Sequence, residues 1–296
     1  MRLLLSNCRL LFMAFVQKFL NFLKSRVKGF TKPDTDRIRI LYLSNDFLAV
    51  HKPYDMLINC NEKTKRPTLQ EELTTMLPHL VNTNLFHGFH FVHRLDFVTS
   101  GVICLPLNKV AARTVAQVFA NRKAKKFYLA LVHGHVQEPC IIINKSIGID
   151  KRHNDNRRMC TVDSDFCKKP KKAITRLFVL ERGYRSEQPA TKVLLYPESG
   201  RQHQLRVHCA AIGHIIIGDY IYSEGADTKP YRTFLHAYRL ILNNELEDLD
   251  IKSIDPFDPS NAKNRWKPTD ILRTLDDDII NEIAKPSQGD NNFTSQ

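Results

Sequence analysis

Cysteine usage in this sequence of 296 residues excludes two kinds of protein at the outset. The seven cysteines are odd in number and include no Cys-x-x-Cys pair. Several lie in apolar surroundings, as Cys104 does in Val-Ile-Cys-Leu. This usage argues against a disulfide framework and against a cysteine-ligated zinc site. It is typical of buried thiols in a reducing compartment.

The sequence also lacks a clean apolar run for a membrane span, which needs about 20 residues. Residues 1–33 carry leucine and phenylalanine at helical spacing, but Arg9, Gln17 and Lys18 interrupt them. The same segment has no acidic residue, which makes it basic and amphipathic. A mitochondrial presequence and an untargeted extension both remain open, whereas a secretory signal fits the thiols poorly. We expect no stable membrane insertion, and a location in the mitochondrion or the cytoplasm.

Acidic residues are outnumbered. Lysine and arginine total 44 against 31 aspartates and glutamates, which gives a net charge of +13. The composition is otherwise ordinary for a globular protein, with 43% hydrophobic and 25% charged residues. The surplus indicates a polyanionic partner, because phosphate contacts dominate nucleic-acid affinity. A basic protein that binds nothing anionic remains the alternative.

The pattern from residue 38 onward predicts antiparallel hairpins with a few helices. Alternating residues on either side of Ser44-Asn45-Asp46 predict a hairpin over 38–50. Thr68 and Glu71 have the capping-box spacing of a helix start. Residues 109–122 repeat apolar side chains at helical spacing, and 173–180 and 191–196 are two further strands. This order favours an α+β fold over a βαβ series.

Three other segments carry expectations. Residues 151–172 are polar and basic and predict a surface loop, either an RNA clamp or a solvated linker. Residues 234–242 predict a strand that closes the sheet. A helix is expected after Lys267-Pro268-Thr269, with Ile271, Leu272, Leu275, Ile279 and Ile280 on one side, followed by a polar tail from Pro286.

Three histidines at 87, 90 and 93 raise the question of a metal site. In an extended strand His90 would point away from the other two, and no nearby cysteine or carboxylate completes a ligand set. Structural, hydrogen-bonded histidines are the better interpretation, and we expect no metal.

Two blocks carry chemistry. In residues 93–101 the carboxylate of Asp96 follows the cation of Arg94 and precedes a polar turn. In residues 199–222 a glycine turn leads into a short helix with Leu205, Cys209 and Ile212 on its buried face. Arg206 then needs an acid partner if it is buried. Asp96 is one candidate, and a surface arginine is the alternative.

Four stretches in order resemble the RluA-type RNA pseudouridine synthases. They are His51-Lys52-Pro53, then His93-Arg94-Leu95-Asp96 with Thr99-Ser100-Gly101, then Lys126-Phe127-Tyr128 through Gly134, and Gly200-Arg201-Gln202-His203-Gln204-Leu205-Arg206-Val207-His208 running into Gly218-Asp219. The resemblance covers about residues 38–245. It implies an α+β pseudouridine synthase fold, in which helices and loops flank a central, mostly antiparallel mixed sheet with an RNA-binding cleft.

The resemblance also implies an isomerase that converts uridine to pseudouridine in structured RNA. Asp96 then matches the essential carboxylate and Arg206 the arginine that pairs with the acid. Tyr128 matches the tyrosine that packs on the base, with removal of the C5 proton as a further role left open. Arg94 matches the arginine that takes the place of the flipped base. No redox change or hydrolysis occurs, so no cofactor or metal is implied.

We expect six side chains to contact the RNA: Lys52, Arg94, Lys125, Lys126, Arg201 and His203. The substrate is transfer, ribosomal or messenger RNA, since all present the same backbone and uridine. We expect a monomer, with a basic extension over 1–36, the synthase domain over 37–258, and a C-terminal helix and tail over 259–296. The alternative is a protein with a synthase-like fold that holds RNA without turnover.

Overall fold

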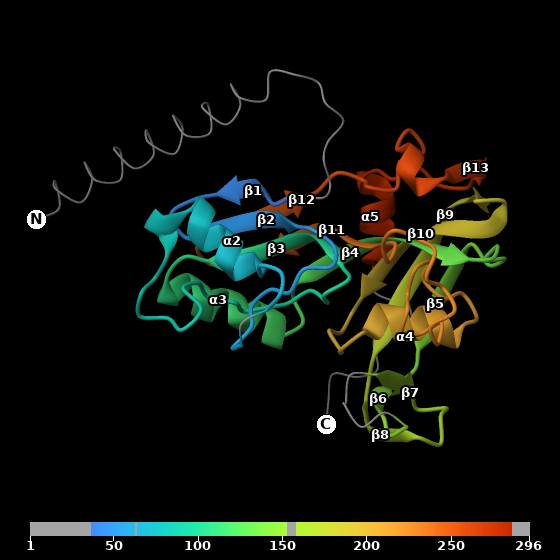
Figure 1. Cartoon of the computed structure of the whole chain (residues 1–296), viewed down its shortest axis with the longest axis horizontal. Helices are drawn as coiled ribbons and strands as arrows, with labels where there is room; N and C mark the ends of the chain where they lie inside the picture. The colour runs from blue at the N-terminus through green and yellow to red at the C-terminus, as the bar shows by residue number, and fades with distance from the viewer. Residues whose placement is uncertain (1–36, 63, 153–157, 286–296) are drawn as a thin grey trace, which may run out of the picture. The chain divides into compact units, whose positions relative to one another are not determined.

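The computed structural model describes residues 37–62, 64–152 and 158–285 (Figure 1). The basic N-terminal segment, with its open question of targeting, lies outside these residues, and so does the polar tail from Pro286. Within the described residues, no helix has both the length and the apolar composition to cross a membrane.

One mixed sheet forms the centre of the fold. Its strands run in the order β1-β2-β3-β11-β4-β10-β9-β13, while β12 pairs with β11 and β5 with β9. The bounds are β1 Arg39–Leu43, β2 Phe47–Lys52, β3 Ser100–Pro106, β4 Lys125–His133, β5 Cys140–Asn144, β9 Ile174–Arg185, β10 Gln188–Pro197, β11 Leu235–Leu242, β12 Leu249–Lys252 and β13 Trp266–Ile271. The two expected hairpins, β1–β2 and β9–β10, are confirmed as antiparallel pairs. The mostly antiparallel α+β prediction is confirmed.

Residues 234–242 were expected to form a strand that closes the sheet. The strand is present as β11, but it lies between β3 and β4 inside the sheet. Its pairing with β3 is the parallel one, with Ser100 opposite His236 and Gly101 opposite Ala237. Gly101 has φ +114°, and a Cβ on it would lie 2.1 Å from the carbonyl oxygen of Ala237. Only glycine permits this approach. The segment that contains Asp96 therefore leads directly to the junction of β3 and β11, where the β1–β2–β3 part of the sheet meets the other strands.

Three of the helices follow their sequence signals. Helix α2 (Leu69–Met76) begins at the expected capping box of Thr68 and Glu71, and the 3₁₀ turn η1 (Pro78–Leu80) follows it. Helix α3 (Lys109–Ala120) packs Ala111, Val115 and Val118 against the buried face of β3. Helix α4 (Gln204–Ala211) is followed by Gly213 at φ +82°, the left-handed conformation that ends helices.

Residues 151–172 are not the loop that their polarity predicted. Strands β6 (Ile147–Asp150), β7 (Met159–Thr161) and β8 (Cys167–Lys171) form a small sheet of their own, in the order β7-β6-β8. Met159 and Cys160 are buried, whereas the four residues 168–171 of β8 are all exposed. An exposed edge strand has no apolar alternation to reveal it, so its lysines gave a loop signal.

The C-terminal prediction is wrong in its start. Residues 266–271 form strand β13, and the helix α5 (Asp277–Ile283) begins only after its N-cap Asp276, whose carboxylate accepts from the amide of Ile279 at 3.0 Å. Pro268 is compatible with a strand because β13 lies at the edge of the sheet. A second 3₁₀ turn, η2 (Ala262–Asn264), precedes it. Residues 259–285 thus belong to the same sheet and core as the rest.

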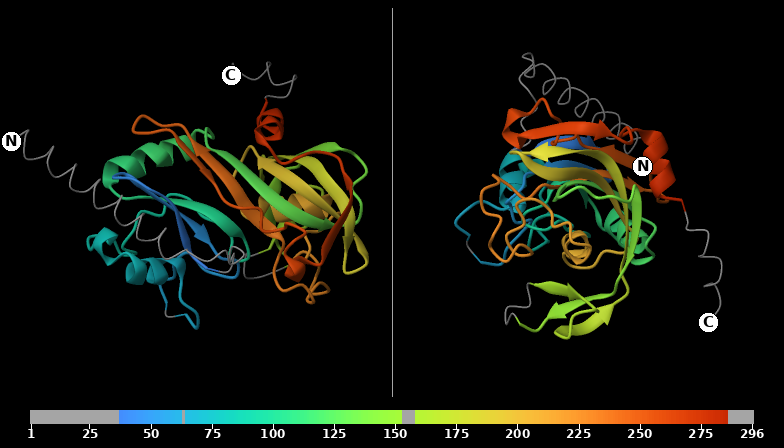
Figure 2. Two further views of the ribbon diagram at one scale, coloured as in Figure 1. Left: turned by 90° about the horizontal axis from the view of Figure 1, so that it is seen from above. Right: turned by 90° about the vertical axis from the view of Figure 1, so that its right-hand side faces the viewer.

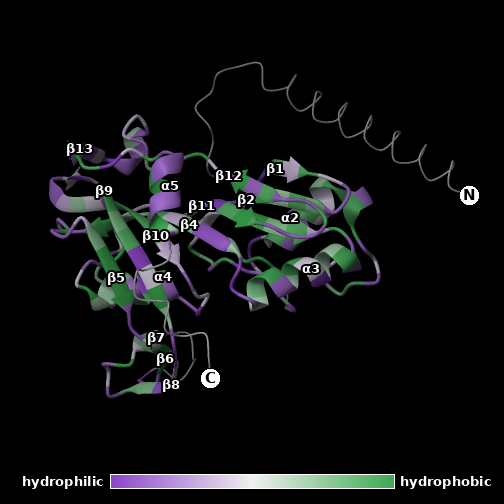
Figure 3. Ribbon diagram, turned by 180° about the vertical axis from the view of Figure 1, so that it is seen from behind, coloured by the Kyte–Doolittle hydropathy of each residue, from purple (hydrophilic) through white to green (hydrophobic). Residues whose placement is uncertain are grey.

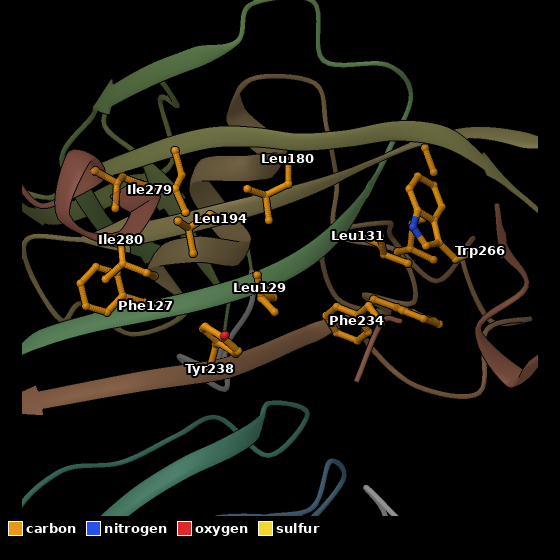
Figure 4. Close-up of a cluster of buried hydrophobic side chains, with 14 residues drawn as sticks. Phe127, Leu129, Leu131, Leu180, Leu194, Phe234, Tyr238, Trp266, Ile279 and Ile280 are labelled. Carbon is orange, nitrogen blue, oxygen red and sulfur yellow. The ribbon is translucent and has the colours of Figure 1, made fainter. Parts of the chain in front are cut away.

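Alternate residues of the central strands build two cores, one on each face. Leu129, Leu131 and Leu194 pack with α5, and Trp266 closes the end of this cluster (Figure 4). Ala130, Val132, Val193 and Leu195 point the other way and pack with Leu205 and Cys209 of α4. In Figure 3 the green of these strands marks their hydrophobic residues, and α4 and α5 are labelled. Figure 2 shows the sheet from two further sides, with the α5 region in red.

The packing of α5 makes a stability prediction. Ile280 is 3% exposed in the core, whereas Ile271 on β13 is 69% exposed. We expect Ile280→Ala to lower the free energy of unfolding by about 2–5 kcal/mol, because it leaves a cavity. Ile271→Ala, the matched control, should change it by about 0.5 kcal/mol or less. Urea unfolding measures both, and equal effects would contradict the assignment of α5 to the core.

Candidate active site

A cavity of about 550 Å³ lies where the residues of the two chemical blocks meet. Its lining comes from three stretches and one further residue: residues 92–99, residues 119–128 around the start of β4, residues 197–206 leading into α4, and Leu235 at the start of β11. Asp96, Tyr128 and Arg206 all line it. The three residues expected to form one site are therefore brought together from positions up to 110 apart in the chain.

Asp96 sits on a turn that the surrounding backbone holds in place. Its own carbonyl accepts from the amide of Thr99 at 3.1 Å. The next carbonyl, of Phe97, accepts from the amide of Met56 at 3.1 Å. The Asp96 side chain remains 21% exposed, so its carboxylate is accessible in the cavity. The fold thus fixes the backbone and leaves the acid open.

Lys52 was expected to contact RNA, but the structure places its side chain inside the protein. Its side chain is fully buried, and its ammonium donates to the carbonyls of Pro53 at 2.9 Å, Met56 at 2.8 Å and Phe97 at 3.2 Å. Burial and the charge of Arg232 lower the pKa of Lys52 to about 7. All three ammonium donors are used inside the protein, so Lys52 holds the Asp96 turn and presents no surface to RNA.

Arg206 is buried and stands between two carboxylates. Its Nε and Nη2 donate to Asp219 at 2.6 and 2.8 Å, a bidentate pair, and its Nη1 lies 3.5 Å from Asp96. Burial opposes the charge, but the hydrogen bonds and charge of Asp219 raise the pKa of Arg206. The expected acid partner Asp96 is present, yet Asp219 is the closer one. Sequence reasoning assigned Asp219 no role, although it stood in the fourth matching stretch.

One tyrosine packs on this arginine, and a second lines the same cavity. The ring of Tyr222 lies 5.1 Å from the guanidinium carbon of Arg206, and its hydroxyl contacts Nδ1 of His203 at 3.1 Å. Tyr128 comes from β4, and burial together with the charge of Asp96 raises its pKa. The phenol of Tyr128 is therefore neutral, and its ring contributes to the wall of the cavity beside the carboxylate.

The other predicted contacts divide into those in the cavity and those outside it. Arg94, Lys126, Arg201 and His203 line it, whereas Lys125 is exposed next to it. Lys126 donates to the carbonyl of Ser199 at 3.1 Å, and burial with the charge of Arg122 lowers its pKa to about 8. His203 has a left-handed backbone at φ 53° just before α4.

Arg122 and Glu198 also line the cavity, and sequence reasoning named neither of them as a site residue. Arg122 is one of four cations within residues 122–126, so its charge alone was no guide. Glu198 pairs with Arg176, with an N–O distance of 2.5 Å, and carried no motif signal.

Residues 86–93 form turns and irregular backbone, and two of their three histidines, His87 and His93, are hydrogen-bonded as expected. The expectation is wrong for His90, whose Nε2 is buried and has no hydrogen-bond partner among the described residues. Nδ1 of His87 contacts Gln70 at 2.8 Å. Nε2 of His93 accepts from the amide of Cys104 at 2.9 Å, and the ring stacks on Phe119 with centroids 4.7 Å apart. Burial and the charge of Lys126 lower the pKa of His93 to about 4. The His93 ring is therefore neutral and supports the wall of the cavity, which it lines.

Comparisons with known proteins identify the family to which this fold and this cavity belong. The family model described as RNA pseudouridylate synthase matches residues 46–211, a range that contains Asp96, Tyr128 and Arg206. The chain belongs to the RNA pseudouridine synthases of the RluA type.

Particular relatives can then be named. RNA pseudouridylate synthase domain-containing protein 1 of Homo sapiens is 40% identical over 243 residues, which are 81% of this chain and 78% of that protein. The dual-specificity RNA pseudouridine synthase RluA of Haemophilus influenzae is 37% identical over 208 residues, 70% of this chain and 87% of that one. The solved structure of Human RNA Pseudouridylate Synthase Domain Containing 1 superposes with a TM-score of 0.74 at 38% identity, covering 86% of this chain and 98% of that one.

The unequal grip of the two acids on Arg206 is testable. Asp219 is fully buried and bidentate, so we expect Asp219→Asn to lower the free energy of unfolding by about 3–5 kcal/mol, as loss of a partner does for a buried ion pair. Asp96→Asn, the isosteric control on the other side of Arg206, should cost under about 1 kcal/mol, because its contact is longer and solvated. Urea unfolding of both variants measures the difference. A larger cost for Asp96→Asn would reverse the assignment of the structural acid.

Proposed function

We propose that this protein isomerises uridine in RNA to pseudouridine, with Asp96 as the catalytic carboxylate. One observation carries the proposal: Asp96 is an accessible carboxylate in a cavity whose wall also holds Tyr128 and a buried, charged Arg206. Family membership supports the reaction class.

The proposed chemistry rearranges one nucleoside without any second reactant. Asp96 attacks or deprotonates the target nucleoside, and the N1–C1′ bond breaks. The carboxylate is displaced, or returns its proton, when the new carbon–carbon bond forms, so it ends unchanged. The base rotates within the cavity, C5 bonds to C1′, and the proton on C5 is transferred so that N1 ends protonated. Atoms and charge balance within the nucleoside, so the reaction calls for neither an oxidant nor water as a reactant. The base must leave its stack to reach Asp96.

Arg206 is proposed to compensate negative charge at the reacting centre. Charge builds up on the carboxylate side of the cavity or on the detached base, and a fixed cation stabilises it without having to reorganise. Asp219 and Tyr222 hold the guanidinium on two sides, which leaves Nη1 directed to Asp96. The bidentate contact to Asp219 is thus a support for the catalytic one.

Tyr128 is proposed as the platform for the base. Its ring offers an aromatic face, which stacks on any pyrimidine. The raised pKa of its hydroxyl keeps the phenol protonated, which favours a packing role over that of a general base in the unliganded protein. Arg94 is exposed at the cavity wall, a suitable place for a side chain that fills the gap left by the flipped base.

A second function remains the competitor: an RNA-binding protein with this fold and no turnover. Loss of the acid would be its signature. Asp96, Tyr128 and Arg206 are all retained and converge on one cavity, which favours the enzyme.

The central test is Asp96→Asn. We expect pseudouridine formation in transcribed, unmodified RNA to fall below detection, because the amide is neither a base nor a carboxylate nucleophile. RNA affinity should stay within about twofold, since one accessible carboxylate contributes no phosphate contact. Substantial residual conversion would overturn the catalytic assignment. Absence of conversion by the wild-type protein on total unmodified RNA would favour the binding protein.

Arg206 is tested by replacement with lysine, which keeps the charge but loses the bidentate fork. We expect kcat to fall by at least about tenfold, with RNA affinity nearly unchanged, because Arg206 is buried and turned toward two carboxylates. Single-turnover kinetics separates the two effects. Arg206→Ala is the more severe companion, and thermal unfolding checks that it still folds. A loss confined to affinity would make Arg206 a phosphate contact instead.

A further inference from the structure

The small sheet β7-β6-β8 presents a row of cations that the proposed chemistry does not use. Lys168, Lys169 and Lys171 of β8 are exposed, and Lys172 follows them directly. In the described part of the chain, no ion pair involves Lys168, Lys169 or Lys171. Nearby Arg152 and Arg158, in contrast, are both paired with Asp150.

The row starts at the cavity. Nε of Arg201, which lines the cavity, donates to the carbonyl of Lys172 at 3.1 Å. From that point Lys168 lies at most about 13 Å away along β8, at 3.3 Å per residue. An RNA strand whose uridine occupies the cavity must continue outward past its mouth.

The row is held rigidly against the site. The backbone amide of Met159 in β7 donates to the hydroxyl of Tyr222 at 3.2 Å, and that tyrosine also contacts His203 and Arg206. His208 of α4 donates from Nε2 to the carbonyl of Lys145, just before β6, at 2.9 Å. Ile147, Met159 and Val207 pack in one buried cluster, which joins the small sheet to α4. Figure 1 shows β6, β7 and β8 as a separate small sheet. The lysines are therefore positioned relative to the cavity by a folded sheet.

The strand has an irregularity that exposes its side chains. Between the pairs Ile149–Lys168 and Ile147–Lys171, β8 carries one residue more than β6, and Lys169 has a left-handed backbone at φ 50°. A bulge of this kind redirects side chains. The left-handed backbone of Lys169 is itself uncommon for a residue other than glycine.

We propose that Lys168, Lys169 and Lys171 bind the phosphate backbone of the RNA next to the target uridine. The inference rests on the proposed function for the identity of the RNA, but the binding itself does not require turnover. A competing explanation is edge protection, since lysine and proline on an edge strand prevent pairing with other sheets. Glutamate protects an edge as well as lysine does, so charge reversal separates the two.

The test compares two triple variants of the full chain with the same change in net charge. The first is Lys168→Glu, Lys169→Glu and Lys171→Glu. The control is Lys252→Glu, Lys263→Glu and Lys267→Glu, three exposed lysines on β12, η2 and β13 that do not line the cavity. A transcribed, unmodified stem–loop RNA with uridines in its loop is the probe, titrated at several KCl concentrations.

For the β8 variant we expect the slope of log affinity against log salt to become shallower by about 2 or more, since each lost phosphate contact removes about 0.7. Affinity at physiological salt should fall on the order of tenfold. The control variant should keep the wild-type slope. Equal losses in both variants would mean that net charge alone is at work, and an unchanged slope in the β8 variant would leave edge protection; either result overturns the proposal.

Pseudouridine formation is measured separately on total unmodified RNA. If the salt slopes of the wild type and the β8 variant differ as expected but the wild type converts no uridine, the proposed function is contradicted and the phosphate contact stands. If the wild type converts uridine and the β8 variant is equally active at every salt concentration, the proposed function stands and the phosphate contact is contradicted.

Discussion

The buried pair of Arg206 and Asp219 is the interaction on which the site depends. A guanidinium taken out of water needs its charge and its hydrogen bonds satisfied, and one carboxylate at 2.6 and 2.8 Å does most of this. Asp219 also accepts from the amides of Ile221 and Tyr222, so it ties the arginine to the following turn. Only because Asp219 fulfils these needs can the remaining Nη1 face Asp96 from 3.5 Å without being consumed by it.

The second constraint is the parallel junction of β3 and β11. The Asp96 turn enters the sheet through β3, whereas Tyr128 and Arg206 come from the far side of β11, on β4 and α4. Close approach at Gly101 therefore sets the distance between the acid and its partners. Lys52 at the end of β2 fixes the same segment, because its ammonium donates to the carbonyl of Phe97. At the site, buried polar groups connect β3 and β11 in addition to the apolar cluster that Val102 and Cys104 share with Leu240.

The sequence predicted those parts whose signal is local. The β1–β2 hairpin follows from alternation, and α2 follows from Thr68 and Glu71, because each pattern is contained within about ten residues. The wrong predictions are of another kind. The lysines of β8 look like a loop because an exposed edge strand has no buried face, and Lys52 looks like a surface cation because nothing local shows that three carbonyls surround it. The role of Asp219 depends on α4 lying beside a turn 13 residues later, which no spacing rule supplies.

Among the described residues, two groups of cations have different physical roles at the site and beside it. Lys52 and Arg206 are buried, and carbonyls or carboxylates of the chain itself satisfy them, so they shape the site. Lys168, Lys169 and Lys171 are solvated and have no acid partner among the described residues, so their charge is available to an external anion. A phosphate that bound the first group would first have to displace internal partners, at the cost of an unpaired buried charge. A phosphate that binds the second group displaces only water and counterions, which is why net positive charge can favour RNA binding without disturbing the balance of charges around Asp96.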